Sequence, residues 1–214
     1  MKIVFLSNQL FDFSLKTNKW HVATRVAGRG HRVLFVDPPI RFRKLAKQVS
    51  EGRWSPSRLL TSSYCFGVEE ETPPGETLGV EESAGLAGGP ELFIFTPISQ
   101  SVSEAPNLTA FNIRRMRKQF PDFFDGEAVL WVYNPAMDEY IERIPHRLLV
   151  YDCVDDYPSM ANYKRLGLSE KVAGKEEGIA RRANVVFATT EKLKEKLSAC
   201  SGNVHYVGNA GDYE

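Results

Sequence analysis

Two adjacent carboxylates are the sharpest candidates for chemistry in this sequence. Asp155 and Asp156 follow an apolar run that begins at Leu148, within the segment Tyr151-Asp152-Cys153-Val154-Asp155-Asp156-Tyr157. A carboxylate in such a place can take a proton from a substrate hydroxyl or accept hydrogen bonds from several hydroxyls. A helix N-cap beside a solvated neighbour explains the same pair equally well. The pair therefore indicates either a general base or a turn.

A histidine offers an alternative base. His21 lies near the start of a helix expected over residues 19–28, just after the first strand. An imidazole there can point toward a ligand and take up a proton near neutral pH. A packed or solvated ring is the more common role of such a residue. The candidate catalytic residues are thus Asp155, Asp156 and His21.

Small polar residues follow most of the expected strands. Hydroxyls, amides and carboxylates are the hydrogen-bond partners that a polyhydroxylated ligand needs. Turn chemistry alone favours the same residue types at strand ends. In a parallel sheet the carboxyl ends of the strands share one edge, where ligands bind. The candidate ligand-binding residues at this edge are Ser7, Asn8, Asn134, Asp152 and Asn209.

A basic cluster suggests contact with an anionic surface. Arg41, Arg43, Lys44 and Lys47 alternate with apolar residues in a segment of helical period, and residues 114–118 add more positive charge. A short basic amphipathic helix of this kind can lie on an anionic membrane face. A solvated helix face explains the same pattern.

Seven short apolar runs alternate with longer segments of helical period. We expect strands at residues 2–6, 32–36, 92–95, 128–133, 148–153, 185–188 and 204–207. We expect helices at residues 19–28, 42–49, 107–120, 135–143, 169–182 and 191–199. The order predicts an α/β, Rossmann-like fold with a mainly parallel sheet of about seven strands and helices on both faces.

Gly28-Arg29-Gly30 closes the first expected helix as a glycine C-cap. It is not the dinucleotide-binding fingerprint, because that motif follows a strand and opens a helix. Residues 61–90 hold a run of glutamates, two adjacent prolines and several glycines. This composition predicts a flexible acidic loop inside a single domain that spans residues 1–208.

The composition excludes several classes of protein. Lys plus Arg equal Asp plus Glu at 27 each, so no overall field attracts nucleic acid or membranes. The three cysteines form no metal-ligand pattern and favour a reducing, cytoplasmic compartment. No run approaches the roughly 20 apolar residues of a membrane-spanning helix. We therefore expect a soluble cytoplasmic protein with, at most, peripheral contact with the inner membrane face.

Three segments, taken together, resemble family 4 type glycosyltransferases, in particular the branch similar to teichuronic-acid and other cell-surface polysaccharide enzymes. The first is Gly28-Arg29-Gly30-His31-Arg32-Val33-Leu34-Phe35-Val36-Asp37-Pro38-Pro39, and the second is Tyr151-Asp152-Cys153-Val154-Asp155-Asp156-Tyr157. The third runs from Glu177 through Ala183-Asn184-Val185 and Thr189-Thr190 to Asn209-Ala210-Gly211-Asp212. Their order and spacing match the family across nearly the whole chain outside residues 61–90.

The resemblance implies a specific architecture and activity. The chain is similar to the amino-terminal, acceptor-side domain of a two-domain (GT-B type) enzyme of the hexosyltransferase class. Residues 209–214 would begin the linker to a carboxyl-terminal domain that binds the nucleotide-diphosphate sugar donor, so this domain alone would be inactive and hold no cofactor. The acceptor would be a sugar or a lipid-linked sugar, bound by Ser7, Asn8, Asn134, Asp152 and Asn209.

The sequence departs from the family's pattern after the first strand. The family often has a glycine-rich turn there, whereas this chain reads Ser7-Asn8-Gln9-Leu10-Phe11. Side chains such as Asn8 or Lys16 would have to replace backbone contact with a phosphate. A receiver domain is excluded because it needs acidic residues at this turn, and a nicotinamide oxidoreductase lacks its fingerprint here. A non-catalytic Rossmann-like binding or scaffold domain stays open.

Overall fold

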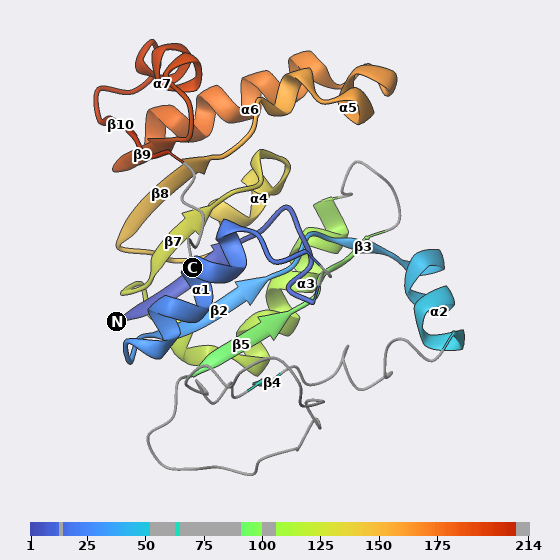
Figure 1. Ribbon diagram of the computed structural model, residues 1–214. Coiled ribbons are helices and arrows are strands. Elements are labelled where there is room, and N and C mark those ends of the chain that lie inside the picture. The colour runs from blue at the N-terminus through green and yellow to red at the C-terminus, as the bar shows by residue number, and fades with distance from the viewer. Residues whose placement is uncertain (13–14, 52–62, 65–90, 100–105, 209–214) are drawn as a thin grey trace, which may run out of the picture.

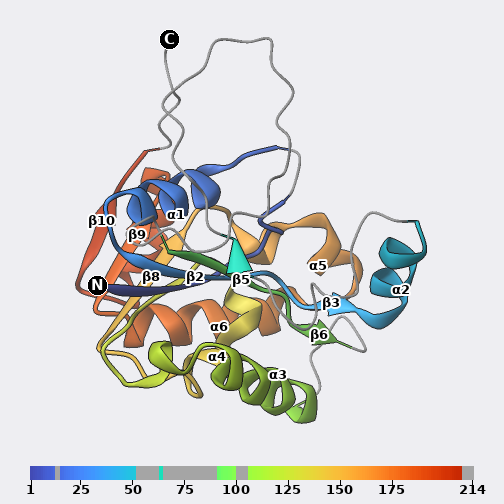
Figure 2. The same cartoon turned by 90° about the horizontal axis from the view of Figure 1, so that it is seen from below.

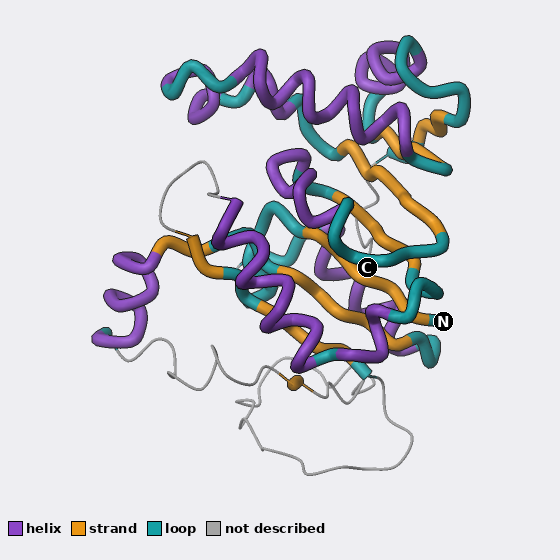
Figure 3. The backbone as a smooth tube through the Cα atoms, turned by 180° about the vertical axis from the view of Figure 1, so that it is seen from behind, coloured by secondary structure: helices purple, strands orange, loops and turns teal. Residues whose placement is uncertain are grey.

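The sheet is the framework of the molecule. The computed structural model describes residues 1–12, 15–51, 63–64, 91–99 and 106–208. Within them lies an eight-stranded sheet in the order β10-β9-β8-β7-β1-β2-β5-β4, visible from opposite sides in Figure 1 and Figure 3. The strands are β1 (Lys2–Leu6), β2 (Arg32–Val36), β4 (Ser63–Tyr64), β5 (Leu92–Phe95), β7 (Val129–Val132), β8 (Leu148–Cys153), β9 (Val185–Ala188) and β10 (Val204–Tyr206).

Seven of these strands pair in parallel, and β4 pairs antiparallel with β5. The predicted α/β, Rossmann-like fold with about seven mainly parallel strands is confirmed. The connecting helices are α1 (Asn18–Gly28), α2 (Phe42–Ser50), α3 (Pro106–Gln119), α4 (Asp138–Ile141), α5 (Ala161–Arg165), α6 (Ser169–Arg182) and α7 (Glu191–Ser198). Single 3₁₀ turns are η2 (Pro121–Phe124), η3 (Pro135–Met137) and η4 (Tyr157–Ser159).

Successive side chains of each strand point to opposite faces of the sheet and pack into two cores. In β1, Val4 and Leu6 pack into the larger core, which α3, α4, α6 and α7 cover. Ile3 and Phe5 point the other way, into a core under α1. Figure 2 shows α1 on one side of the sheet and α3, α4 and α6 on the other. Strands buried on both faces read as continuous apolar runs, which is why they are visible in the sequence.

Most differences from the predicted elements involve short segments. The helix predicted over residues 135–143 is the 3₁₀ turn η3 followed by α4, which ends at Ile141. A two-stranded parallel sheet of β3 (Ile40–Arg41) and β6 (Ile98–Ser99) was not predicted, nor was α5. The flexible loop predicted over residues 61–90 lies outside the described residues, apart from the two residues of β4.

The predicted glycine cap is present after α1. Gly30 has φ +81 and donates its backbone N–H to the carbonyl of Ala27 at 2.9 Å. This left-handed conformation strains any residue with a Cβ, so glycine is required there. The turn leads directly into β2 at its amino end, away from the edge where ligands bind in such sheets.

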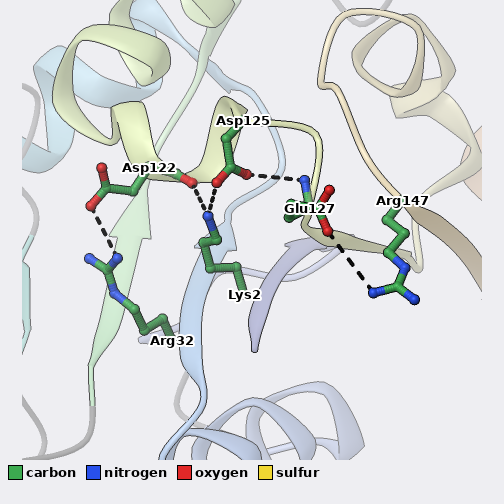
Figure 4. A network of polar contacts seen from close by, with 6 residues as sticks. All are labelled: Lys2, Arg32, Asp122, Asp125, Glu127 and Arg147. Carbon is green, nitrogen blue, oxygen red and sulfur yellow. Dashed lines mark hydrogen bonds and ion pairs between the residues drawn. The ribbon is translucent and has the colours of Figure 1, made fainter.

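The amino-terminal edge of the sheet is closed by charge pairs (Figure 4). Lys2 on β1 bonds the carbonyl of Asp122 at 2.9 Å and pairs with the Asp125 carboxylate. Arg32 on β2 pairs with the Asp122 carboxylate at 3.0 Å. Pairing with Lys2 lowers the pKa of Asp125. These contacts tie η2 and the turn after it to the two central strands.

Candidate functional site

The strand order places a switch point beside the first strand. From β1 the chain builds outward through β2 and β5, then returns to add β7, β8, β9 and β10 on the other side of β1. The connections leaving β1 and β7 therefore diverge at the carboxyl ends of these strands. Open parallel sheets bind ligands in the crevice that such a divergence creates.

A cleft of about 550 Å³ lies at this edge. Its walls come from the loop after β1, the first turn of α1, the end of β2, the helix α2 and the end of β8. The polar side chains that line it include Asn8, Thr17, Lys19, Lys44 and Asp155. Two predicted site residues, Asn8 and Asp155, thus line the same cleft, although they are far apart in the sequence.

A buried carboxylate holds the loop that carries Asn8. Asp37, fully buried after β2, accepts the backbone N–H of Phe11 at 2.8 Å and the hydroxyl of Thr96 at 2.7 Å. Ser7 is also buried, and its hydroxyl accepts the N–H of Gln9 at 3.0 Å. The predicted ligand-binding residue Ser7 therefore shapes the turn, and its role toward a ligand stays a prediction.

The Asn8 side chain leaves a polar atom without a partner. Its Oδ1 atom is buried and accepts no hydrogen bond from any residue that the structure describes. Native proteins pair the great majority of such atoms, because an unpaired buried acceptor costs about 1–3 kcal/mol. An unpaired acceptor in the wall of a cleft can be paired by a hydroxyl or N–H group of a ligand.

The two adjacent aspartates have different surroundings. Asp155 lines the cleft, and its backbone carbonyl accepts the N–H of Tyr157 at 3.0 Å, which sets the turn after β8. Asp156 instead pairs with Lys196 of α7 at 2.9 Å. Hydrogen bonding from Ser159 and Lys196 lowers the pKa of Asp156. A carboxylate stabilised in this way is a weaker base than one facing open solvent.

Lys196 joins Asp156 to the buried side of the sheet. Its ammonium also pairs, at 2.6 Å, with Glu176 of α6, which is fully buried. Glu176 accepts the hydroxyl of Tyr151 at 2.9 Å. Removing one member of a buried charge pair costs several kcal/mol, so this network fixes the position of the Asp156 side chain. The predicted catalytic role of Asp156 stays a prediction.

A third carboxylate lies beneath the cleft. Asp152 on β8 accepts the indole N–H of Trp131 at 3.1 Å. Burial raises the pKa of Asp152, while the hydrogen bond from Trp131 and the charge of Lys19 oppose that rise. Asp152 is therefore held by the sheet, next to the cleft rather than in its lining, and its predicted contact with a ligand stays a prediction.

Sequence reasoning missed the most unusual side chain of the site. Lys19 is 6% exposed and lines the cleft from the first turn of α1. Its ammonium lies 5.7 Å from the centre of the Tyr133 ring. Burial lowers the pKa of Lys19, and the charges of Asp155 and Asp152 oppose that shift. A lysine in the first turn of a helix, where the dipole disfavours a cation, was the available signal.

The remaining predicted residues are placed differently. Asn134 bonds the carbonyl of Ser7 at 3.4 Å and accepts the N–H of Ala136 at 3.0 Å, which joins the ends of β1 and β7. The His21 ring stacks edge-on against Trp20 at 5.2 Å, and among the described residues it is not part of the cleft lining. Asn209 lies outside the described residues. Their predicted roles are untested.

The predicted membrane-contact residues surround a helix that stands at one end of the molecule (Figure 1). Arg41, Arg43, Lys44 and Lys47 are all exposed on or beside α2. Lys44 also lines the cleft, and Lys47 pairs with Glu51 at 3.7 Å. No helix among the described residues is both long and apolar enough to cross a bilayer. The cluster is therefore available to a surface, and its contact with a membrane stays a proposal.

The described residues contain no group of three or more histidine, cysteine, aspartate or glutamate side chains that can hold a metal ion. The polar side chains that line the cleft are three amides, one hydroxyl, one carboxylate and two amines. No model of a known protein family matches the chain, and no curated protein matches it.

Proposed function

We propose that this chain is the acceptor-binding domain of a nucleotide-sugar-dependent glycosyltransferase of the GT-B, family 4-like type. The enzyme would act in the synthesis of cell-surface polysaccharide or glycolipid. One observation carries the proposal: the cleft at the switch point of the sheet is lined by Asp155, Lys19 and the unpaired acceptor of Asn8. A second domain would hold the nucleotide-diphosphate sugar, as the resemblance implies.

The cleft suits a hydroxyl-rich acceptor better than an apolar ligand. Asn8 and Asp155 supply hydrogen-bond acceptors, and Thr17 and Lys19 supply donors. A sugar offers both kinds of group on neighbouring carbons, so one ring can pair several of these side chains at once. Sites built to pair hydroxyls discriminate strongly against ligands that lack them.

Asp155 is the best placed of the candidate bases. It would accept the proton of the acceptor hydroxyl while that oxygen bonds to the anomeric carbon of the donor sugar. The bond from the anomeric carbon to the diphosphate breaks, and the nucleoside diphosphate leaves. Closing the second domain over the cleft would exclude water and hold both reactants in place. Asp156 is a poorer base because Lys196 holds it in its charged form.

Replacing the two aspartates one at a time in the full-length protein tests the proposal. We expect Asp155→Asn to lower turnover by about 100- to 10,000-fold, the usual contribution of a general base. Asp156→Asn should cost less than about tenfold, because a half-exposed pair such as Asp156–Lys196 contributes about 1 kcal/mol at most. The measurement is a donor screen with detection of the product by mass.

Two results would contradict the proposal. Equal turnover by the wild type and Asp155→Asn would remove Asp155 from the mechanism. Binding of saccharides by the full-length protein without transfer from any nucleotide sugar would favour the alternative, a non-catalytic Rossmann-like binding domain.

A further inference from the structure

Lys19 is a charged side chain that the protein buries without pairing. It is 6% exposed, and it forms no hydrogen bond or ion pair with any residue that the structure describes. Its ammonium lies 5.7 Å from the centre of the Tyr133 ring, and the charges of Asp155 and Asp152 act on it without forming an ion pair. Long charged side chains are almost never this buried unless a partner neutralises them.

The start of α1 adds positive charge to the same wall of the cleft. The first turn of α1 contains no acidic residue, and the Thr17 side chain does not cap it. The Thr17 hydroxyl is instead donated to the side-chain carbonyl of Gln9 at 2.8 Å. The positive end of the helix dipole therefore faces the cleft without a side-chain cap from Thr17 or an acidic residue in the first turn. Lys44 of α2 lines the cleft too.

Other groups that line the cleft have the reverse character. Asp155 is the carboxylate of the lining, and the Asn8 Oδ1 atom is an acceptor without a donor among the described residues. Among the described residues, the Lys19 ammonium thus lacks a direct hydrogen-bond acceptor and the Asn8 Oδ1 atom lacks a donor. An oxyanion can accept the charge-assisted hydrogen bonds of the ammonium more strongly than a neutral hydroxyl can.

The geometry points to an acceptor that carries an oxyanion, a phosphate or a carboxylate, next to its reacting hydroxyl. The Lys19 ammonium, together with Lys44 and the start of α1, holds the oxyanion, and Asn8 and Asp155 take the hydroxyls. That this ligand is the acceptor of a glycosyl transfer rests on the proposed function, whereas binding of an anion does not. The Lys19 ammonium supplies the short charge-assisted contact, and Lys44, being exposed, contributes less.

Calorimetric titration of this chain with three sugars of the same ring size tests the inference. The probes are glucose 6-phosphate, glucuronate and glucose. We expect both anionic sugars to bind more tightly than glucose. Lys19→Met should weaken the anionic sugars by about tenfold or more, because a hydrogen bond to a charged group contributes about 1.5–3 kcal/mol. Its affinity for glucose should fall less than its affinity for the anionic sugars, because glucose carries no charge for the ammonium to pair. The preferred anion distinguishes a phosphate-bearing from a carboxylate-bearing acceptor.

Lys171→Met is the matched control. Lys171 is exposed in the first turn of α6, whereas Lys19 is buried in the first turn of α1. It is not part of the lining of the cleft among the described residues. We expect Lys171→Met to bind all three sugars like the wild type. A loss confined to Lys19→Met then reports a specific contact, because both variants remove one positive charge.

Several outcomes would overturn the inference. They are equal binding of glucose and the anionic sugars by the wild type, equal binding of glucose 6-phosphate by the wild type and Lys19→Met, and an equal loss in Lys171→Met. Unfolding of both Lys19→Met and Lys19→Gln, judged by circular dichroism, would also overturn it, because Lys19 would then be held by the protein itself. If Lys19→Met still transfers sugar to neutral acceptors, the proposed function stands and the anionic acceptor is ruled out. If the full-length protein binds anions through Lys19 but transfers no sugar, anion binding stands and the proposed function is ruled out.

Discussion

The two edges of the sheet treat polar side chains in opposite ways. At the amino-terminal edge, Lys2 and Arg32 find acidic partners on η2 and the turn that follows it (Figure 4). At the carboxyl-terminal edge, Lys19 is buried without an ion pair among the described residues, and Asn8 keeps an unpaired acceptor. The first edge pairs its charged side chains within the chain, whereas the second keeps polar groups that no described residue pairs. Buried polar atoms without a partner also occur elsewhere, for example on Thr109 and Ser169, so the candidate site rests on the gathering of polar groups in one cleft.

The largest effect on stability should come from Asp37, the buried carboxylate that supports the loop after β1 at the carboxyl-terminal edge of the sheet. Asp37→Ala removes the acceptor for the Phe11 N–H and the Thr96 hydroxyl, and all three residues are buried. We expect a loss of about 2–4 kcal/mol in the free energy of unfolding, since two buried donors lose their partner. Asp122→Ala at the closed edge should cost less than about 1 kcal/mol, because its pair with Arg32 is exposed. Urea denaturation measures the free energy of unfolding of both variants. Equal losses would show that the two edges do not differ in how much their carboxylates stabilise the fold.

The strands could be predicted from the sequence because their signal is local. Residues buried on both faces, such as Val4 and Phe5 in β1, form apolar runs that need no knowledge of the partner strand. The short pair β3 and β6 gave no such run, because two residues per strand are too few to set a pattern. The helix α5 is also short, and none of its residues is buried.

The site could be predicted only in part because its geometry depends on distant residues. The sequence places Asp155 and Asp156 side by side, but Lys196, 40 residues after Asp156, decides that one pairs with α7 while the other lines the cleft. The burial of Lys19 depends on Tyr133 at the end of another strand. Position relative to the strand ends was informative, whereas the pairing of each side chain was not visible in the sequence.

Binding to anionic vesicles would show which edge of the sheet faces a membrane. Arg43 and Lys47 are exposed on α2, which follows β2 at the open edge. We expect Arg43→Gln with Lys47→Gln to weaken co-sedimentation with phosphatidylserine vesicles by about tenfold or more, since each basic residue contributes about 1 kcal/mol. As a control, Arg29→Gln with Arg147→Gln removes two exposed charges from the amino-terminal edge of the sheet. Equal losses in the two double variants, or binding insensitive to the anionic lipid content, would count against membrane contact through α2.

The smallest and most specific effect is on the pH dependence of stability. Asp125 at the amino-terminal edge and Asp152 at the carboxyl-terminal edge should contribute to it with opposite signs. Pairing with Lys2 lowers the pKa of Asp125, whereas burial raises the pKa of Asp152; both shifts are relative to the ordinary value of 3.8. The folded protein binds fewer protons at Asp125 than the unfolded chain does. The stability contributed by Asp125 is therefore present above pH 3.8 and is lost as the pH falls through its lowered pKa.

Asp152 contributes in the opposite direction, because the folded protein binds more protons there than the unfolded chain does. Its contribution to stability falls as the pH rises from 3.8 through its raised pKa. Relative to the wild type, Asp152→Asn should therefore gain stability as the pH rises through this range, and Asp125→Asn should lose stability as the pH rises toward 3.8. Thermal unfolding of both variants from pH 3 to pH 7 measures the two slopes. Slopes of the same sign would show that Lys19 and the hydrogen bond from Trp131 already stabilise the charged form of Asp152, so that no ligand is needed to balance the charges at the carboxyl-terminal edge.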